Sequence, residues 1–237
     1  MPFARESEMT KPVLKWLHRQ SLLTKVEFGL PWGICDLVGL SFNQAQVAKR
    51  LSFRQHRPIG PIQRVELLRH IPDQESGQSI TLKRLQKAAG ETVFGSTIDR
   101  DLAILISNGF VVSKKNGTLQ KLNGWAPIHD RIVAVELKLS RISEALSQAL
   151  SNCSFATESY IALPKLTASR FADNARYSEF REAGIGVLGV TRTSCKVISP
   201  AQARYAQDDT LQMHCVERFW RTRDNSSSVA ERRVQVS

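Results

Sequence analysis

Hydrophobic residues in the first part of the chain follow two different periods. Between residues 7 and 19 they recur at helical spacing, which predicts a helix. Two apolar runs follow at 25–28 and 34–40, and the glycines and proline of Gly29-Leu30-Pro31-Trp32-Gly33 between them favour a turn. The chain is therefore expected to begin with a helix and a β-hairpin.

The pattern is lost between residues 41 and 61, where basic side chains accumulate without apolar periodicity. We interpret residues 46–60 as a basic linker. Its cationic and titratable side chains are Lys49, Arg50, Arg54, His56 and Arg57.

A compact group of short elements is expected next. Helical patterns cover residues 62–71, 80–89 and 96–108, and Gly109 follows the last of them as a helix C-cap would. Two β-like runs, 110–113 and 118–122, flank Lys114-Lys115-Asn116-Gly117, and Asn-Gly between such runs is a strong hairpin signal. Three helices followed by a small hairpin predict a winged helix.

Strands and helices alternate in the remaining sequence, which predicts a mixed α/β sheet. The expected elements are strand 131–139, helix 142–153, strand 160–163, helix 168–183 and strands 186–190 and 196–198. From about Thr222 the chain has no periodicity, and we expect a flexible tail.

Composition indicates the class of partner. Lys and Arg number 33 against 22 Asp and Glu, a formal net charge of +11, which favours an anionic partner such as nucleic acid. No apolar stretch approaches the ~18 residues of a membrane span, and no signal-peptide pattern is present, so no membrane association is expected. The four cysteines form no CxxC pair, which argues against a zinc site or disulfide framework and favours a reducing, cytoplasmic setting.

Charged residues interrupt two apolar strands. In the run 131–139, Glu136 and Lys138 share one face, and Asp36 interrupts the run 34–40. Burying such charges costs several kcal/mol unless they are paired or bind something. Two carboxylates and a lysine suit phosphodiester hydrolysis, because carboxylates bind Mg²⁺, with Mn²⁺ as an alternative, and a lysine can orient water or stabilise phosphate charge.

The order of these parts resembles the PD-(D/E)XK phosphodiesterase superfamily. Helix and hairpin precede Gly33-Ile34-Cys35-Asp36-Leu37-Val38, and Val133-Ala134-Val135-Glu136-Leu137-Lys138 precedes a helix and a strand. The resemblance covers about residues 5–40 and 131–190, and it implies a restriction-endonuclease-like mixed sheet flanked by helices. It also implies that Asp36 and Glu136 bind the metal and that Lys138 is the catalytic lysine.

The sequence departs from the family pattern in two ways. Cys35 replaces the proline before Asp36, and about 100 residues separate Asp36 from Glu136. An inserted domain accounts for the separation, because a compact module can replace a surface loop. The resulting division is core 1–45, linker 46–60, inserted winged helix 61–123, core 124–200, C-terminal extension 201–221 and tail 222–237.

Two further site residues follow from the resemblance. Family members often place a glutamate on the first helix, and Glu6 lies within the apolar arc of that helix while Glu8 lies nearly opposite. We therefore favour Glu6, and Glu27 is another candidate acid. Gln148 resembles the polar residue that relatives place near the metal, although an ordinary solvent-facing glutamine would fit equally well.

The winged helix is expected to contact DNA. Its second motif helix would present Ser96, Thr97 and Arg100 to base edges. The side chains expected at phosphates are Lys83, Arg84, Lys87, Lys114 and Lys115. Winged helices also serve as protein-interaction modules, and that alternative stays open.

The expected function is a metal-dependent DNA endonuclease acting on double-stranded DNA. The alternatives are a catalytically inactive DNA-binding protein or transcriptional regulator on a nuclease-like scaffold, and an RNA-directed nuclease. Cutting both strands would favour a homodimer, but the sequence shows no interface.

Overall fold

The computed structural model describes residues 3–89, 95–122, 127–172 and 178–220, without the side chains at positions 95, 96, 171 and 172. Two compact units are present. Unit 1 comprises Met1–Ser41 and Asp130–Asp208, and unit 2 comprises Phe42–His129 and Asp209–Ser237. The long segment of unit 2 therefore interrupts the sequence of unit 1.

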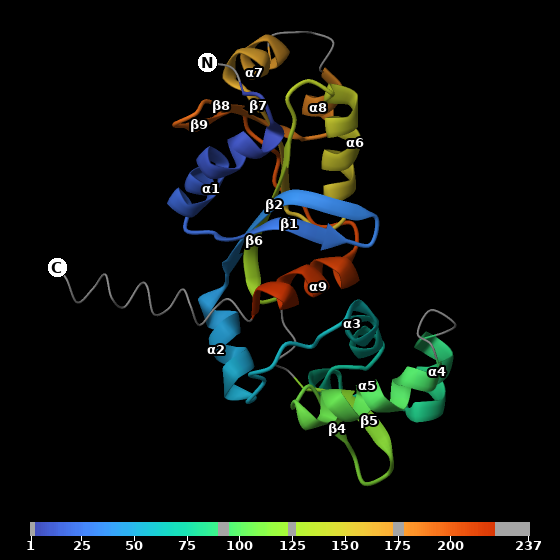
Figure 1. Ribbon diagram of the computed structural model, residues 1–237. Helices are drawn as coiled ribbons and strands as arrows, with labels where there is room; N and C mark the ends of the chain where they lie inside the picture. The colour runs from blue at the N-terminus through green and yellow to red at the C-terminus, as the bar shows by residue number, and fades with distance from the viewer. Residues whose placement is uncertain (1–2, 90–94, 123–126, 173–177, 221–237) are drawn as a thin grey trace, which may run out of the picture. The chain divides into compact units, whose positions relative to one another are not determined.

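Unit 1 is built around a six-stranded sheet (Figure 1). Its elements are η1 (Glu6–Met9), α1 (Thr10–Arg19), β1 (Leu23–Leu30), β2 (Gly33–Phe42), β6 (His129–Leu137), α6 (Ile142–Asn152), β7 (Glu158–Pro164), α7 (Lys165–Ala172), α8 (Ser178–Glu182), β8 (Gly186–Val190) and β9 (Cys195–Ser199). The strand order is β1-β2-β6-β7-β8-β9. Strands β6, β7 and β8 run parallel, whereas the β1–β2 and β8–β9 pairs are antiparallel.

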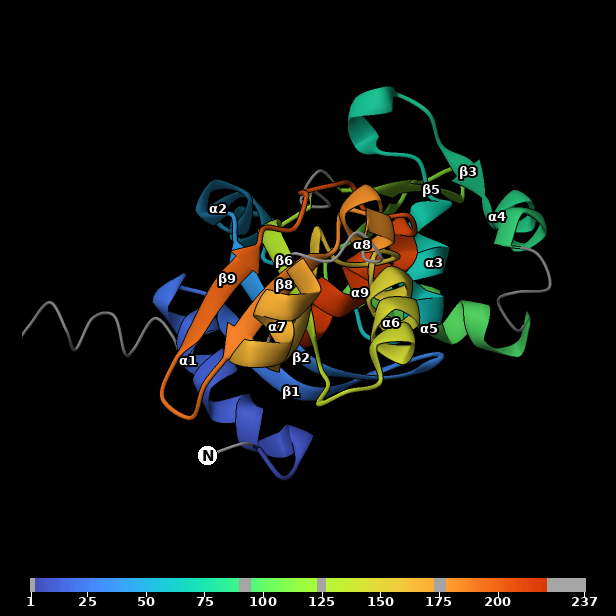
Figure 2. The same cartoon turned by 90° about the horizontal axis from the view of Figure 1, so that it is seen from above.

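Helices cover both faces of this sheet (Figures 1 and 2). Along β6, Val133 and Val135 pack into the same core cluster as Leu17 of α1. On the other face, Ile161 of β7 packs with Ala149 of α6. The two-residue alternation of a strand produces this division, and it buries apolar side chains on both sides. The prediction of a mixed α/β sheet flanked by helices is confirmed.

Unit 2 combines helices with a small antiparallel sheet of order β3-β5-β4. Its elements are α2 (Gln44–Ser52), α3 (Ile62–Arg69), η2 (Gln74–Ser76), β3 (Ile80–Thr81), α4 (Leu82–Ala89), α5 (Gly95–Ser107), β4 (Val111–Ser113), β5 (Thr118–Lys121) and α9 (Asp209–Trp220). Leu68 of α3, Leu105 of α5 and Met213 of α9 belong to one buried cluster. The C-terminal helix α9 is thus part of the core of unit 2.

Part of the segment that we interpret as a basic linker, 46–60, is helical, because α2 extends to Ser52. The side chain of Asn43 caps the helix, accepting a hydrogen bond from the backbone N–H of Gln46 at 2.9 Å. The buried side of α2 carries Val47 and also Arg50, which is 2% exposed. A helix that buries an arginine has no continuous apolar stripe, so hydrophobic periodicity does not reveal it.

Arg50 is neutralised by Glu217 of α9, which is also 2% exposed. One guanidinium nitrogen, Nη2, donates to Glu217 Oε2 at 3.1 Å, and the other Glu217 oxygen pairs with Nη1. Glu217 also accepts from the backbone N–H of Ile59 at 2.7 Å, and the Arg50 guanidinium lies 3.9 Å from the ring centre of Trp220. This bidentate pair joins segments of unit 2 that are far apart in sequence.

Other boundaries also differ from the expected ones. The expected helix 80–89 begins as the short strand β3. The expected helix 168–183 overlaps α7, which begins at Lys165, and contains α8. The expected core segment 124–200 corresponds to a stretch of unit 1 that runs from Asp130 to Asp208. The tail expected at 222–237 lies outside the described residues. No helix in the described ranges is long and apolar enough to cross a membrane.

Candidate functional site

Asp36 lies opposite a kink in the β1–β2 hairpin. The register pairs Val26 with Leu37 and Phe28 with Cys35, but it has no Glu27–Asp36 pair between them. Glu27 has a φ of +50°, in the left-handed region that L-residues rarely adopt. The kink interrupts the regular hairpin ladder at Asp36, the residue that the sequence singles out.

The carboxylate of Asp36 contacts strand β6. Asp36 Oδ2 accepts a hydrogen bond from the backbone N–H of Leu137 at 2.7 Å. Burial raises the pKa of Asp36, and the hydrogen bond from Leu137 and the charge of Lys138 oppose this rise. The side chain is therefore fixed beside the segment that carries Glu136 and Lys138.

Glu136 is almost completely buried, at 2% exposure. Its Oε1 accepts a hydrogen bond from Asn152 Nδ2 of α6 at 2.7 Å. Burial raises the pKa of Glu136 to about 7, and the charge of Asp36 adds to the rise. Glu136 and Asp36 are thus two nearby carboxylates that compete to be ionised.

Lys138 directly follows β6 and is also buried, at 6% exposure. Its Nζ donates to Glu144 Oε1 of α6 at 3.2 Å. Burial raises the pKa values of Asp36 and Glu136, and the charge of Lys138 opposes both rises. The ammonium group is therefore electrostatically coupled to both carboxylates while it pairs with a third.

The three other candidate acids, Glu6, Glu8 and Glu27, occupy different surroundings. Glu6 Oε1 accepts from the backbone N–H of Leu139 at 3.2 Å, and the charge of Glu6 raises the pKa of Asp36. Glu8 instead pairs with Arg192 at 3.3 Å, and Glu27 is exposed. The structure therefore brings Glu6 close to Asp36 and to Leu139, the residue after Lys138, whereas Glu8 pairs elsewhere.

Gln148 lies beside Glu136 at a cavity of about 280 Å³. The cavity is lined by Leu30, Trp32, Gly33, Ile34, Glu136, Ser147, Gln148, Ser151 and Asn152. Gln148 Oε1 is buried and has no hydrogen-bond partner among the described residues. The cavity lining is apolar where it comes from the β1–β2 hairpin and polar where it comes from β6 and α6.

The donor atoms suit a hard divalent cation. Across the described ranges, no group of three or more His, Cys, Asp or Glu side chains is arranged to hold a metal. Mg²⁺ needs only one or two protein carboxylates, because it keeps several waters and takes substrate oxygens. Asp36 and Glu136 meet that requirement, and a cation would relieve their repulsion. The neighbouring Cys35 thiol is a poor ligand, because burial raises its pKa well above the ordinary value.

Sequence reasoning missed two polar residues of α6 that contact the site, Glu144 and Asn152. Asn152 follows Gln148 by one helical turn, so both lie on the same helix face. That spacing is the signal that could have identified Asn152. Glu144 precedes Gln148 by the same four residues, so this spacing also places it on that helix face, although its ion pair depends on the position of Lys138.

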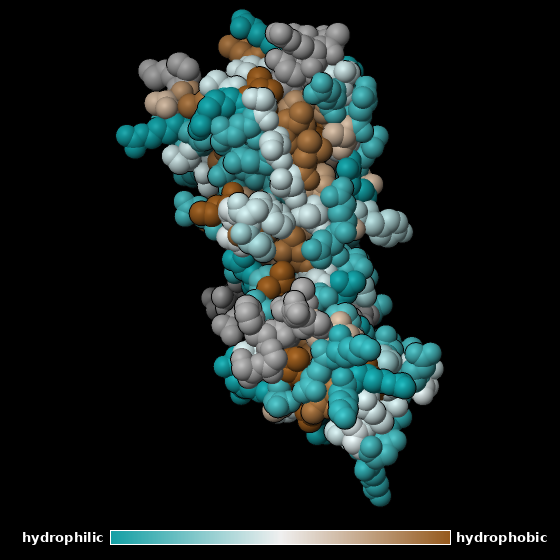
Figure 3. Space-filling model, turned by 90° about the vertical axis from the view of Figure 1, so that its right-hand side faces the viewer, coloured by the Kyte–Doolittle hydropathy of each residue, from teal (hydrophilic) through white to brown (hydrophobic). Residues whose placement is uncertain are grey.

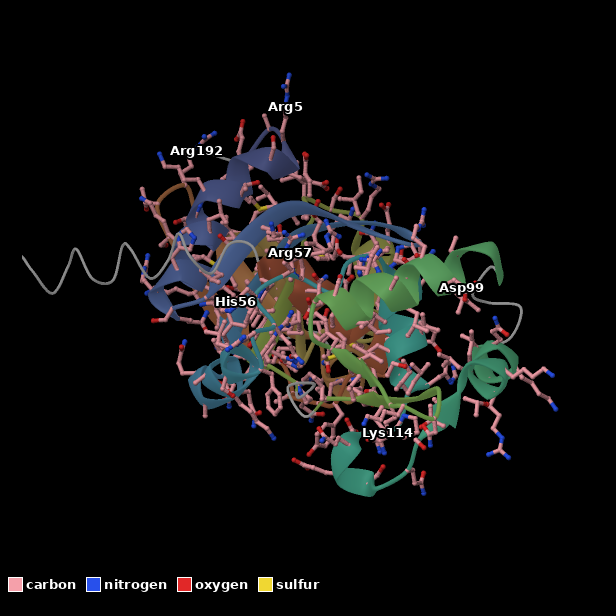
Figure 4. The ribbon with its side chains drawn as sticks, turned by 90° about the horizontal axis from the view of Figure 1, so that it is seen from below. Arg5, His56, Arg57, Asp99, Lys114 and Arg192 are labelled. Atoms are coloured by element: carbon pink, nitrogen blue, oxygen red, sulfur yellow. The ribbon has the colours of Figure 1, made fainter. Side chains whose placement is uncertain are left out.

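The residues expected to contact DNA lie in unit 2. Lys83, Arg84 and Lys87 are exposed on α4, and Arg100 is exposed on α5. Thr97 is half-buried on α5, and the Ser96 side chain lies outside the described residues. Exposed Lys114 and Lys115 occupy the turn between β4 and β5, and Figure 4 labels Lys114 there. The expected contacts therefore lie on three separate elements of the unit.

Comparisons of the chain with protein-family models, curated proteins and solved structures find no match. Function is therefore inferred from the site geometry of unit 1 and from the element order and exposed charges of unit 2.

Proposed function

We propose that this chain is a metal-dependent DNA endonuclease of the restriction-endonuclease-like PD-(D/E)XK type. One observation carries the proposal: Asp36 of β2 contacts the β6 segment that holds Glu136 and Lys138, about 100 residues later. A purely structural sheet has no need of three charged residues there, since buried charges cost free energy unless they are used or paired. Phosphodiester hydrolysis uses this combination of two acids and one lysine.

Each side chain has a distinct role in the proposed reaction. Asp36 and Glu136 would hold the cation through carboxylate oxygens, and the Leu137 N–H and Asn152 amide fix the orientation of these carboxylates. Bound Mg²⁺ supplies a Lewis acid and lowers the pKa of a coordinated water. Lys138 donates to the attacking water or to a phosphate oxygen and so stabilises the charge that develops in the transition state.

Glu6 contributes a further acid near Asp36. Its carboxylate is held by the backbone N–H of Leu139, at a distance of 3.2 Å. From this position its carboxylate could accept a hydrogen bond from the attacking water and take up the proton that the water loses. Glu6 is therefore proposed as a positioning residue for the water.

The alternative is a DNA-binding protein that keeps the nuclease-like scaffold without activity. The observation that favours it is the Lys138–Glu144 contact at 3.2 Å, which occupies the lysine. Glu144 is partly exposed and also pairs with Arg141 at 2.8 Å. Glu144 therefore keeps Arg141 as a cationic partner if Lys138 turns to a phosphate. For this reason we prefer an active nuclease to an inactive scaffold.

Unit 2 is proposed to be a winged helix that binds duplex DNA. The order α3, β3, α4, α5 and the β4–β5 hairpin is the order of a winged helix, with α5 as the recognition helix. Arg100 on α5 is exposed and available to a base edge. The exposed lysines and arginine of α4, together with the lysines of the β4–β5 turn, would contact phosphates and give salt-dependent affinity.

Plasmid cutting tests the proposal. Purified protein is incubated with supercoiled plasmid in Mg²⁺, in Mn²⁺ and in chelator, alongside the Glu136→Gln variant. Relaxation or linearisation in metal that disappears in chelator and in the variant supports the nuclease. Equal cutting by the variant would place the activity elsewhere, and binding without cutting in either metal would favour the inactive scaffold.

A further inference from the structure

The cavity beside Glu136 has one apolar wall, formed by the turn of the β1–β2 hairpin. Leu30 and Gly33 are paired across the ladder, so Pro31 and Trp32 form a two-residue turn. Trp32 is 50% exposed and Ile34 is 63% exposed. Figure 3 shows the side of unit 1 that carries this turn and α6, where apolar surface appears among polar side chains.

The opposite wall is polar and comes from α6. It consists of Ser147, Gln148, Ser151 and Asn152. Glu136 also lines this space, so it is adjacent to the proposed metal site. An occupant would therefore meet an apolar surface on one side and hydrogen-bonding groups on the other.

We propose that this cavity receives an unpaired nucleobase next to the phosphate that is cut, with Trp32 stacking on its face. A nucleobase has a flat π-face and an edge of N–H and C=O groups, which match the two walls. The hydrogen-bonding edge would face the polar residues of α6 that line the cavity. The aromatic wall tolerates any base, because every base has a π-face, so Trp32 provides affinity without sequence preference.

This inference rests on the proposed nuclease function and narrows its substrate. Bases within an intact duplex are stacked and paired, and taking one out costs free energy that is smallest where the base is already unpaired. The substrate class is therefore DNA in which duplex adjoins single strand, as in a fork. Unit 2 would bind the duplex part of this DNA, and the cavity beside Trp32 would bind the unpaired nucleotide.

Binding measured in chelator tests the inference separately from catalysis. The full chain is titrated by fluorescence anisotropy against a forked duplex and against the same sequence fully paired. The variants are Trp32→Ala, Trp32→Phe and Val26→Ala, with thermal unfolding as the folding control. Val26 is the matched control, because it is 49% exposed on the same hairpin but does not line the cavity.

The expected result is that Trp32→Ala weakens binding of the fork about tenfold, the size of one lost stacking contact, and changes binding of paired DNA little. Trp32→Phe and Val26→Ala should stay near wild type. Unchanged fork binding in Trp32→Ala, or equal loss on both DNAs, would overturn the inference. If wild type is a dimer and Trp32→Ala is a monomer, the inference would also be overturned, because the β1–β2 turn would then form a contact with a second copy of the chain. Intact fork preference without any metal-dependent cutting would instead contradict the nuclease proposal.

Discussion

The carboxylate of Asp36 accepts a hydrogen bond from the backbone N–H of Leu137 at 2.7 Å, and this bond joins two strands that are separated by the whole of the long unit 2 segment. Asp36 thus has a structural role as an acceptor and a proposed chemical role as an anion. The two roles can be separated, because an amide oxygen can perform only the first.

Replacing Asp36 separates these roles. Asp36→Asn keeps an acceptor for the Leu137 N–H, so the free energy of unfolding should change by less than about 1 kcal/mol while cutting falls about 100-fold or more. Asp36→Ala leaves the N–H without its partner and should also lose about 1–3 kcal/mol of stability. Denaturant unfolding and plasmid cutting measure the two effects. Full activity in Asp36→Asn would show that the charge is not used.

Glu136 should make the stability of the metal-free protein depend on pH. Its pKa is raised from 4.5 to about 7 in the folded state, so the folded protein keeps a proton that the unfolded chain has lost. The contribution of Glu136 to the free energy of unfolding is therefore fully present below about pH 4.5. It is lost as the pH rises from there through 7. The stability of wild type relative to Glu136→Gln should fall by up to about 3 kcal/mol over this range.

Thermal unfolding of both proteins in chelator, between about pH 5 and pH 8, measures this difference. Adding Mg²⁺ at the upper end should raise the melting temperature of wild type more than that of Glu136→Gln, because the cation favours the ionised carboxylate. A difference between the two proteins that does not change with pH would mean that the Glu136 carboxyl titrates in its ordinary range.

Local sequence patterns predict the sheet of unit 1 because its strands obey a two-residue alternation. The run that became β6 shows this most clearly, since Val133 and Val135 face one core while Glu136 faces α6. The same alternation identifies Glu136 as a charge on an otherwise apolar strand. Strand patterns therefore predict both the sheet and its candidate acids.

Patterns of this kind fail where burial depends on a distant partner. Helix α2 has no continuous apolar stripe because Arg50 is buried on the same side as Val47, and Glu217 compensates the arginine's charge from 167 residues away. The Lys138–Glu144 contact likewise depends on how α6 returns along the sheet. No local signal in the sequence marks either pair, so only the three-dimensional arrangement reveals them.

The Arg50–Glu217 pair should be important for the stability of unit 2. Glu217→Ala leaves a buried guanidinium without its counter-charge and should cost about 3–5 kcal/mol in denaturant unfolding. The matched control is Glu75→Ala, which removes an exposed pair with Lys49 at 3.9 Å and should cost less than about 1 kcal/mol. Similar costs for the two variants would show that the buried pair is not specifically stabilising.

The lysines of the β4–β5 turn should contribute to the salt dependence of DNA binding. If Lys114 and Lys115 each contact a phosphate, replacing both by alanine should reduce the slope of log K against log salt by about 1.8. The control replaces Lys11 and Lys15, two exposed lysines of α1 in unit 1. Equal slope changes in the two double variants would indicate a general charge effect and no specific contact.

The proposed hydrolysis of DNA by Asp36, Glu136 and Lys138 requires the lysine, so we would measure cutting by Lys138→Met. Single-turnover cutting of end-labelled DNA in Mn²⁺ is compared among wild type, Lys138→Met and Glu8→Gln, all purified in parallel. The variant Glu8→Gln removes a carboxylate that pairs with Arg192 outside the cluster. We predict that Lys138→Met loses about 100-fold or more in rate and that Glu8→Gln stays near wild type. Equal rates for Lys138→Met and wild type would show that this cluster does not hydrolyse DNA in the way proposed.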